Sequence, residues 1–250
     1  MDIKGKRVIV TGGANGIGKA LVLKLLEVGA TVAVLDIDVY GLYNNISKDN
    51  IGVLCCFCDV SDSEQVAMAV ERVSDKLGAI DILVNNAGIV ADSPLIGFSS
   101  EGIKRHSVDL WDKIIATNLS SVFYVSSCVA EKMFSQRTRG IIVNVSSISA
   151  AGNVGQGAYS AAKAGIRALT TTWAKELGPF GIRVAGIAPG FTETETMIHS
   201  MSDDVLANWK RSTPLKRLGM PSEIVDGIMW IIGNDFFHGR TLEIDGGLRM

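Results

Sequence analysis

A glycine-rich segment between an apolar run and an amphipathic pattern places the strongest constraint on the fold of this chain. Arg7 to Val10 is rich in β-branched residues, which favour strands, and the sequence TGGANGIG follows at residues 11–18. Beyond it, apolar side chains recur at helical spacing as far as Gly29, a residue type that ends helices. A strand, a glycine turn and a helix in this order begin a βαβ unit, so we expect a parallel sheet.

The same alternation of short apolar runs with longer helical patterns continues along the chain. Further strands are predicted at residues 31–35, 51–57, 80–84 and 240–244, and helices at residues 62–77, from about 109 and at 157–177. The 250 residues, 47% of them hydrophobic, can bury a large core within one domain. We therefore predict a single α/β domain over residues 1–250, a doubly wound, Rossmann-type parallel sheet of about seven strands with helices on both faces.

The composition excludes several classes of protein. A formal net charge of -2 and a pI near 5.9 provide no basic patch, so nucleic acid is not an expected partner. The N-terminal residues enter a strand directly, and no later apolar run approaches membrane-spanning length. We therefore expect a cytoplasmic protein that does not bind a membrane. Three of the four cysteines, Cys55, Cys56 and Cys58, alternate between the faces of a strand, which does not suit one metal ion, and no metal site is predicted.

The glycine segment has the composition of a phosphate-binding turn. Gly12, Gly16 and Gly18 allow a tight turn, close approach of a pyrophosphate and close packing of the helix, whose N-terminus offers unpaired N–H groups. Asp36, at the end of the next strand, is placed to accept hydrogen bonds from an adenosine ribose and to repel a 2′-phosphate. Since Ile37 supplies no compensating cation, NAD is expected in preference to NADP. The alternative reading of Asp36 is a plain turn aspartate.

A second stretch with chemical potential runs from Val143 to Ala168 and carries Tyr159 and Lys163. Four residues of separation place both side chains on one helical face, with the ammonium close to the phenol. A free tyrosine ionises near pH 10, about three units too high for easy proton exchange at neutral pH, and a nearby cation favours the phenolate. Ser146, at the end of the preceding strand, is placed to polarise a carbonyl group. By itself this spacing is more typical of an ordinary amphipathic face.

These motifs occur together in an order that resembles the short-chain dehydrogenase/reductase family. The resemblance is carried by TGGANGIG at the first turn, NNAG at residues 85–88, Asn118, Ser146, the Tyr159-x-x-x-Lys163 pair and Pro189-Gly190. It covers nearly the whole chain. The three residues between Gly12 and Gly16 are typical of the compact, single-domain members of the family. The total length agrees, because it leaves little room for an additional substrate domain.

The resemblance implies a role for each catalytic position. Tyr159 would act as the general acid or base, and Lys163 would lower the tyrosine pKa and bind the nicotinamide ribose. Ser146 would donate a hydrogen bond to the substrate oxygen, and Asn118 would hold a water that links Lys163 to solvent.

The resemblance also implies which residues bind the cofactor. Asp59 and Val60 would border the adenine, residues 86–88 would line the ribose, and residues 189–194 would hold the nicotinamide amide. The complete predicted set is Gly12, Asn15, Gly16, Ile17, Gly18, Asp36, Ile37, Asp59, Val60, Asn86, Ala87, Gly88, Tyr159, Lys163, Pro189, Gly190, Thr192 and Thr194.

Two further regions concern access of the substrate. Residues 191–214 carry an apolar stripe of Met197, Ile198, Met201 and Trp209, which predicts a substrate lid or, alternatively, a buried helix face. Residues 91–109 form an insertion that either edges the active site or elaborates the surface, and the sequence favours neither reading.

Together these features predict an NAD(H)-dependent oxidoreductase that interconverts a secondary alcohol and a ketone or aldehyde, with a small-molecule alcohol or carbonyl compound as its partner. One alternative is a 3-oxoacyl-thioester reductase acting on acyl-carrier-protein or coenzyme A substrates. Another is a catalytically silent dinucleotide-binding regulator, against which the intact Tyr159 and Lys163 argue. The helix at 157–177 carries small and apolar residues on more than one face, which one monomer core cannot easily cover. Members of the family commonly pair this helix across a dimer axis, so we predict a homotetramer.

Overall fold

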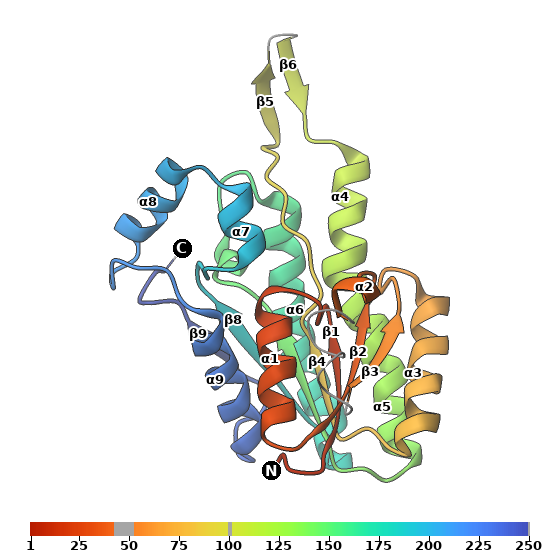
Figure 1. Ribbon diagram of the computed structural model, residues 1–250. Helices are drawn as coiled ribbons and strands as arrows, with labels where there is room; N and C mark the ends of the chain where they lie inside the picture. Colours follow the sequence, from red (N-terminus) through yellow and green to blue (C-terminus); the bar gives the residue numbers. More distant parts are fainter. Residues whose placement is uncertain (43–52, 100–101, 250) are drawn as a thin grey trace.

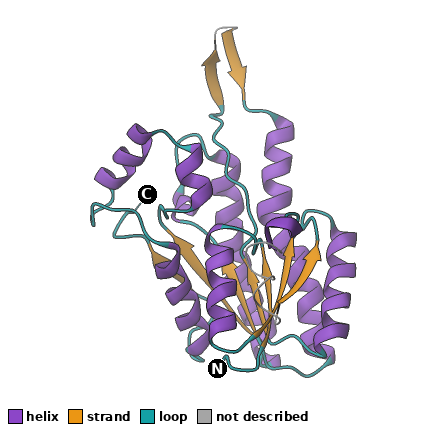
Figure 2. Ribbon diagram, viewed as in Figure 1, coloured by secondary structure: helices purple, strands orange, loops and turns teal. Residues whose placement is uncertain are grey.

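A parallel β-sheet with helices on both faces forms the body of the molecule (Figures 1 and 2). The computed structural model describes residues 1–42, 53–99 and 102–249. Within these residues the main sheet has seven strands, and a separate two-stranded sheet stands apart from it. The arrangement confirms the predicted single-domain, Rossmann-type α/β fold.

The strands of the main sheet follow the order β3-β2-β1-β4-β7-β8-β9, and every neighbouring pair is parallel. They are β1 (Arg7–Thr11), β2 (Thr31–Asp36), β3 (Val53–Phe57), β4 (Ile82–Asn85), β7 (Ile141–Val145), β8 (Arg183–Pro189) and β9 (Thr241–Ile244). The chain moves outward from β1 to β3 and then returns to the other side of β1 with β4. Where the strand order reverses in this way, the carboxyl ends of the strands border a crevice that can bind a ligand.

Apolar side chains of each strand alternate between two cores, one on each face of the sheet. In β1, Val8 and Val10 belong to one core, whereas Ile9 belongs to the other. The first core is covered by α1 (Gly16–Glu27) and α9 (Pro221–Gly233), and the second by α3 (Ser63–Leu77), α5 (Ser121–Ser135) and α6 (Gly157–Leu177). Burial on both faces explains why the central strands are continuous apolar runs.

Short elements complete the connections between these strands and helices. They are α2 (Val39–Leu42), the 3₁₀ turns η3 (Ile148–Ala151) and η4 (Gly178–Phe180), and the helices α7 (Glu195–Ser200) and α8 (Asp203–Ser212). Both η3 and α7 follow strands at the carboxyl edge of the sheet, the edge where the site is expected.

The inserted segment forms an arm. Its strands β5 (Ile96–Ser99) and β6 (Gly102–Arg105) are antiparallel and project beyond the body above α4 (Val108–Ile115; Figure 1). Phe98 and Ile103 are cross-strand partners, and they are 87% and 72% exposed. A small apolar pocket of about 240 Å³ lies between the base of the arm and α4. The arm itself is a surface elaboration, whereas residues 89–92, which precede it, line the main cavity.

Most element boundaries lie within two residues of the prediction, with one informative exception. Residues 51 and 52 of the predicted third strand lie outside the described residues. The helix predicted from about residue 109 is not a continuous α-helix, because α4 ends at Ile115 and η2 (Ala116–Ser120) forms a π-helical turn before α5 begins. Such turns occur frequently at functional sites, where the extra residue redirects a side chain. Asn118 lies in this turn.

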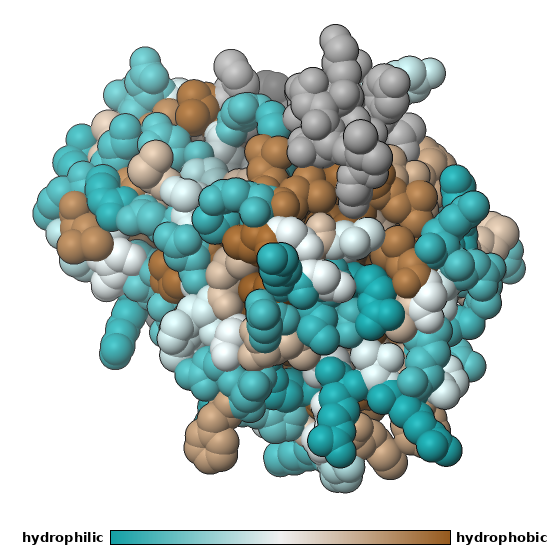
Figure 3. Space-filling view, turned by 60° about the horizontal axis from the view of Figure 1, so that its bottom comes forward, coloured by the Kyte–Doolittle hydropathy of each residue, from teal (hydrophilic) through white to brown (hydrophobic). Residues whose placement is uncertain are grey.

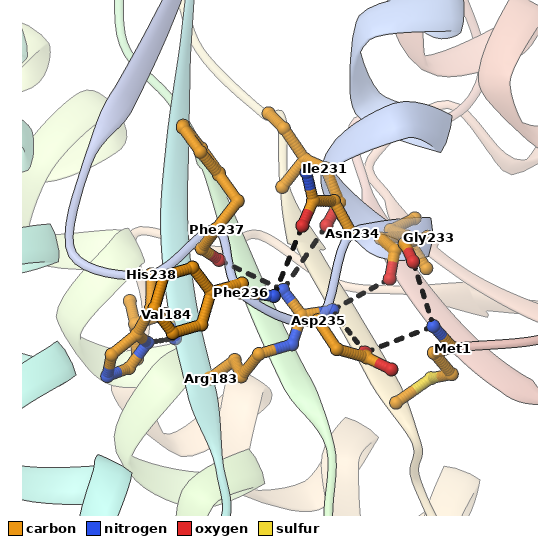
Figure 4. A network of polar contacts seen from close by, with 11 residues as sticks. Met1, Arg183, Val184, Ile231, Gly233, Asn234, Asp235, Phe236, Phe237 and His238 are labelled. Atoms are coloured by element: carbon orange, nitrogen blue, oxygen red, sulfur yellow. Dashed lines mark hydrogen bonds and ion pairs between the residues drawn. The ribbon is translucent and has the colours of Figure 1, made fainter.

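Polar contacts hold the end of α9 against the sheet (Figure 4). The Arg183 guanidinium, at the start of β8, donates to the carbonyl oxygens of Ile231, Ile232 and Phe237. Asp235 lies 3.4 Å from this guanidinium and 3.0 Å from the amino group of Met1. Since the last carbonyls of a helix lack partners within the helix, Arg183 satisfies groups that would otherwise be unpaired.

The surface at the N-terminal ends of the strands is mostly hydrophilic, with small apolar areas (Figure 3). Among the described residues, one helical run, Val108–Ser135, is long and apolar enough by length and composition to cross a membrane. This run consists of α4, η2 and α5, which pack against α3, α6 and β4 as core helices do.

Candidate active site

One cavity at the carboxyl ends of the strands brings together nearly all of the predicted site residues. Its volume is about 940 Å³. All four predicted catalytic residues line it, and so does every predicted cofactor-binding residue except Gly18. The lining residues come from the connections that follow β1, β2, β3, β4, β7 and β8, so positions as distant in sequence as Gly12 and Thr194 share one site.

Close backbone contacts shape the glycine turn after β1. Gly12 has a φ of +66°, and a Cβ atom on it would lie 2.7 Å from the Cα atom of Ala87. Gly18 does not line the cavity, but a Cβ atom there would collide with the Gly12 carbonyl oxygen, so glycine allows α1 to pack against the turn. The Asn86 amide donates to the same carbonyl at 2.8 Å and fastens the NNAG segment to the turn.

The N-terminus of α1 is suited to an anion. Its N-cap residue, Asn15, makes no side-chain capping bond, and the first turn of the helix contains no acidic residue. Gly16 and Ile17, in that first turn, line the cavity. The N–H groups of the turn and the positive end of the helix dipole therefore form a cradle that fits a pyrophosphate.

Lys163 and Tyr159 lie one turn apart on α6 beside the cavity. Lys163 is 4% exposed, donates to the carbonyl oxygen of Val145 at 2.9 Å, and has its Nζ atom 5.6 Å from the centre of the Tyr159 ring. Burial lowers the pKa of Lys163 to about 8. Burial also raises the pKa of Tyr159, and a hydrogen bond with Ser147 only partly opposes this rise. Burial therefore opposes the lowering of the tyrosine pKa that is expected from Lys163.

Two adjacent serines follow β7, and they have different partners. The Ser146 hydroxyl is buried, with the residue 2% exposed, and donates to the backbone carbonyl of Lys163 at 2.8 Å. Ser147 instead makes a hydrogen bond with Tyr159, and its hydroxyl also accepts from the N–H of Ser149 at 3.1 Å. Both serines line the cavity, and the role that the resemblance implies for Ser146, a hydrogen bond to the substrate oxygen, stays a prediction.

Asn118 is fully buried in the π-helical turn. Its side-chain oxygen accepts from the N–H of Ile89 at 3.1 Å, and its amide donates to the carbonyls of Ile89 and Ile114, each at 3.0 Å. A Cβ atom on Gly88 would lie 2.5 Å from this oxygen and 3.6 Å from the Lys163 Nζ atom. Asn118 therefore fixes the segment that follows β4 close to the ammonium group.

Gln156 and Asp92 form a part of the cavity wall that the sequence did not identify. Gln156 is 8% exposed, and its amide donates to the Asp92 carboxylate at 2.9 Å. Nearby, the N–H of Ser93 donates to the carbonyl of Gly155 at 2.7 Å. These bonds fasten the segment leading into the arm to the loop that precedes α6, a pairing of distant segments that no local pattern reveals.

The region predicted to be a lid flanks the cavity. Met197, Met201 and Trp209 line the cavity, whereas Ile198 is 42% exposed. The ring of Trp209 stacks on Phe191, with ring centres 4.2 Å apart and planes at 4°. Three of the four residues of the apolar stripe therefore belong to the cavity wall.

Cys56 in β3 and Cys58 just after it are buried core thiols. Cys56 and Cys58 are each 1% exposed, and burial raises the pKa of Cys58 to about 12. Among the residues that the structure describes, no group of three or more His, Cys, Asp and Glu side chains could hold a metal ion.

Curated relatives match the chain over its whole length. The protein is 39% identical to the 3-oxoacyl-(acyl-carrier-protein) reductase of Thermotoga maritima and 40% identical to that of Chlamydia pneumoniae, with 99% of each chain covered in both comparisons. It is 36% identical to the reductase of the same name from Vibrio harveyi, with 100% of both chains covered.

These relatives contradict the predicted preference for NAD over NADP, because reductases of this kind depend on NADPH. The structure supplies a physical reason why the inference from Asp36 failed. Its carboxylate accepts backbone N–H groups from Ala14 and from Asp38, each at 2.9 Å. Asp36 thus acts as a turn aspartate, which was the alternative interpretation. Its presence alone does not decide between the free ribose of NAD and the 2′-phosphorylated ribose of NADP.

A sequence model of the family described as short chain dehydrogenase matches residues 6–204, which is most of the chain. The match includes the glycine turn, the NNAG segment and the Tyr159–Lys163 pair, all of which lie at the same cavity. The chain therefore belongs to the short-chain dehydrogenase family and is an oxidoreductase that acts on a CH–OH or carbonyl group.

Proposed function

We propose that this protein is a 3-oxoacyl-thioester reductase, which reduces the 3-oxo group of an acyl chain carried on acyl-carrier protein or coenzyme A. The observation that carries this proposal is the full-length identity of 36% to 40% with reductases of that name. NADPH is the proposed reductant. The residues that would hold it all line the cavity: Gly12 and Gly16 of the glycine cradle, Asn86, Ala87 and Gly88, and Pro189, Gly190, Thr192 and Thr194.

The residues of the cavity are suited to proton transfer in the reductive direction. A bound reduced nicotinamide supplies the hydride that the carbonyl carbon accepts. Because burial raises its pKa, Tyr159 keeps its proton at neutral pH and can donate it to the oxygen as negative charge develops there. Lys163, with a pKa of about 8, is mostly charged at pH 7 and stabilises the phenolate that remains.

The proposal assigns the orientation of the substrate carbonyl to Ser146, which lines the cavity on the turn after β7. When no substrate is bound, its hydroxyl donates to the backbone carbonyl of Lys163 at 2.8 Å. Ser146→Ala is expected to lower kcat by about a hundredfold or more, because a positioned donor to a developing oxyanion contributes roughly that much. Ser147→Ala is the matched control at the neighbouring position and should lower kcat by a smaller factor. A larger kcat loss in Ser147→Ala would overturn the assignment.

Three further features belong to the proposal. Residues 191–214 form the substrate lid, which the lining residues Met197, Met201 and Trp209 support. The active form is a homotetramer, and the small and apolar residues on more than one face of α6 support an interface at that helix. The enzyme works in the cytoplasm. Light scattering coupled to size-exclusion chromatography tests the tetramer, and a stable monomer at micromolar concentration would refute it.

The decisive experiment measures NADPH consumption with acetoacetyl-coenzyme A and a 3-oxoacyl-acyl-carrier protein, beside a panel of simple ketones and aldehydes. The thioesters are expected to have a kcat/KM at least about tenfold above the simple carbonyl compounds. Tyr159→Phe, which retains the ring but lacks the proton, is expected to lose the activity. Preference for simple ketones would refute the thioester assignment, and an active Tyr159→Phe variant would refute the mechanism.

A further inference from the structure

We propose that the arm is a clasp between two copies of this chain, which packs its apolar side chains onto an aromatic pair, Phe134 and Phe180, of the second copy. The inference rests on the homo-oligomeric state proposed above and does not depend on the identity of the substrate. Neither the strands of the arm nor this aromatic pair lines the cavity.

The arm exposes more apolar surface than a hairpin of its size can support. Its strands β5 and β6 have four residues each, and an isolated two-stranded hairpin is at best marginally stable in water. In the part of the chain that the structure describes, no other element packs extensively against them (Figure 1). Four large apolar side chains of the arm are 58% to 87% exposed: Leu95, Ile96, Phe98 and Ile103. An exposed apolar patch of this kind marks a surface that binds another molecule.

Hydrogen bonds at the base of the arm fix its direction relative to the body. The N–H of His106 donates to the carbonyl of Leu95 at 3.0 Å and closes the hairpin, and the N–H of Ser93 donates to the carbonyl of Gly155 at 2.7 Å. The bond from Gln156 to Asp92 adds a side-chain contact to the same loop. Because a surface that is already oriented loses less freedom on binding, this anchorage favours docking.

An exposed aromatic stripe runs from the base of the arm along α4, η2 and α5. Its members are Trp111, Phe123 and Phe134, which are 42%, 52% and 59% exposed. Phe123 and Phe134 are eleven residues apart, which is three helical turns to within about 20°. Trp111 and Phe123 are twelve residues apart, but the π-helical turn between them accommodates one extra residue. All three rings therefore lie along one face of the helical run.

The stripe ends at the aromatic pair, on the opposite side of the molecule from the arm. The rings of Phe134 and Phe180 meet edge to face, with centres 5.1 Å apart and planes at 88°, and Phe180 is 56% exposed. The run Val108–Ser135 has 28 residues, which corresponds to about 42 Å of helix. In Figure 1 the arm stands at the top of the view, whereas α5 ends near the bottom. The arm therefore cannot reach the aromatic pair of its own chain.

A second copy related by two-fold symmetry brings these two apolar features together. A two-fold axis across the middle of the run, perpendicular to it, pairs the run with its copy in antiparallel orientation. The first residues of α4 in one copy then lie beside the last turn of α5 in the other, so each arm meets Phe134 and Phe180 of the second copy. The two stripes face each other between the arms. One contact thus covers the arm, the stripe and the aromatic pair, and aromatic side chains are typical of such interfaces.

Site-specific photo-crosslinking of the purified full chain tests this contact directly. A benzophenone amino acid placed at position 98 should crosslink two chains, with the new bond in peptides that contain Phe134 or Phe180 when the product is analysed by mass spectrometry. Since about 42 Å of helix separates the arm from this pair within one chain, such a bond reports a contact between copies. The same probe at position 57, on the outer strand β3, should not react there.

Sedimentation analysis of single and double variants tests the energetic importance of the contact. Phe98→Ser and Phe134→Ser should each raise the dissociation constant of the oligomer at least about tenfold, because a few aromatic anchors contribute most of the binding energy of an interface. The double variant should be about as weak as the weaker single variant, since both substitutions remove the same contact. Phe57→Ser, which changes a side chain that is 62% exposed outside the stripe, should leave the dissociation constant unchanged within about twofold.

The outcomes separate this inference from the proposals on which it borders. Crosslinks from position 98 that avoid Phe134 and Phe180 would refute the clasp, and so would additive effects of Phe98→Ser and Phe134→Ser. A wild-type protein that is a stable monomer at micromolar concentration would refute the homotetramer and the clasp together. Reduction of 3-oxoacyl thioesters by the wild type is measured independently, so the proposed function can fail while the clasp holds, and the reverse.

Discussion

Replacing Lys163 by methionine should change how the stability of the protein depends on pH. Lys163 is 4% exposed, and burial lowers its pKa from the ordinary 10.5 to about 8. The unfolded chain therefore holds this proton more tightly than the folded chain does. The contribution of the lysine to stability is complete above the unfolded pKa and is lost as the pH falls through the folded pKa.

The size of the effect follows from the two pKa values. A shift of about 2.5 units corresponds to about 3 kcal/mol at pH values well below 8. Between pH 7 and about pH 9.5, the wild type should recover about 2 kcal/mol of this amount, whereas a protein with methionine at this position recovers none. Methionine also leaves the carbonyl of Val145 without the ammonium donor, at a cost of about 1–3 kcal/mol that does not depend on pH. At pH 7 the two effects oppose each other, so the two proteins should have similar stability.

Urea denaturation of the wild type and Lys163→Met at both pH values measures the difference in free energy of unfolding. Groups common to both proteins cancel in this difference, which should move by about 2 kcal/mol in favour of the wild type at the higher pH. Lys175→Met is the control, because Lys175 is exposed on the same helix and its replacement should shift stability by less than about 0.5 kcal/mol at either pH. A difference for Lys163→Met that stays constant with pH would refute the reasoning.

Three other predictions concern the cradle, the sheet and the cavity wall. Gly18→Ala should weaken NADPH binding at least about tenfold in a fluorescence titration, because its Cβ atom meets the Gly12 carbonyl, whereas Gly233→Ala, with open space around it, should not. Asp81→Asn should lower the free energy of unfolding by about 2 kcal/mol at neutral pH. Although burial opposes it, Arg7 holds the pKa of Asp81 below its ordinary value, so thermal denaturation should show this loss vanishing as the pH falls through that pKa. Trp209→Ala should raise KM for the thioester with little change in kcat, since the ring lines the cavity.

The parts of the fold that the sequence predicted are those that local chemistry determines. Strands buried on both faces must be continuous apolar runs, and the glycine turn after β1 tolerates no other residue at Gly18 without a collision. The π-helical turn at Asn118 could not be predicted, because one extra residue in a turn barely alters the helical period. The insertion was recognised in the sequence, but its strands β5 and β6 were not predicted, since Phe98 and Ile103 find no core and follow no periodic pattern that a buried face would impose.

Individual roles at the site depend on partners from distant parts of the chain, and this is where inference from spacing is weakest. Asp36 was expected to select the ribose, but its carboxylate is engaged by the N–H groups of Ala14 and Asp38. Ser146 and Ser147 are adjacent, yet the Ser146 hydroxyl donates to the backbone carbonyl of Lys163, whereas the Ser147 hydroxyl accepts from the N–H of Ser149. A family motif fixes which segments meet at the cavity. The hydrogen-bond partners of each side chain are set by the fold around it, and they become visible only in three dimensions.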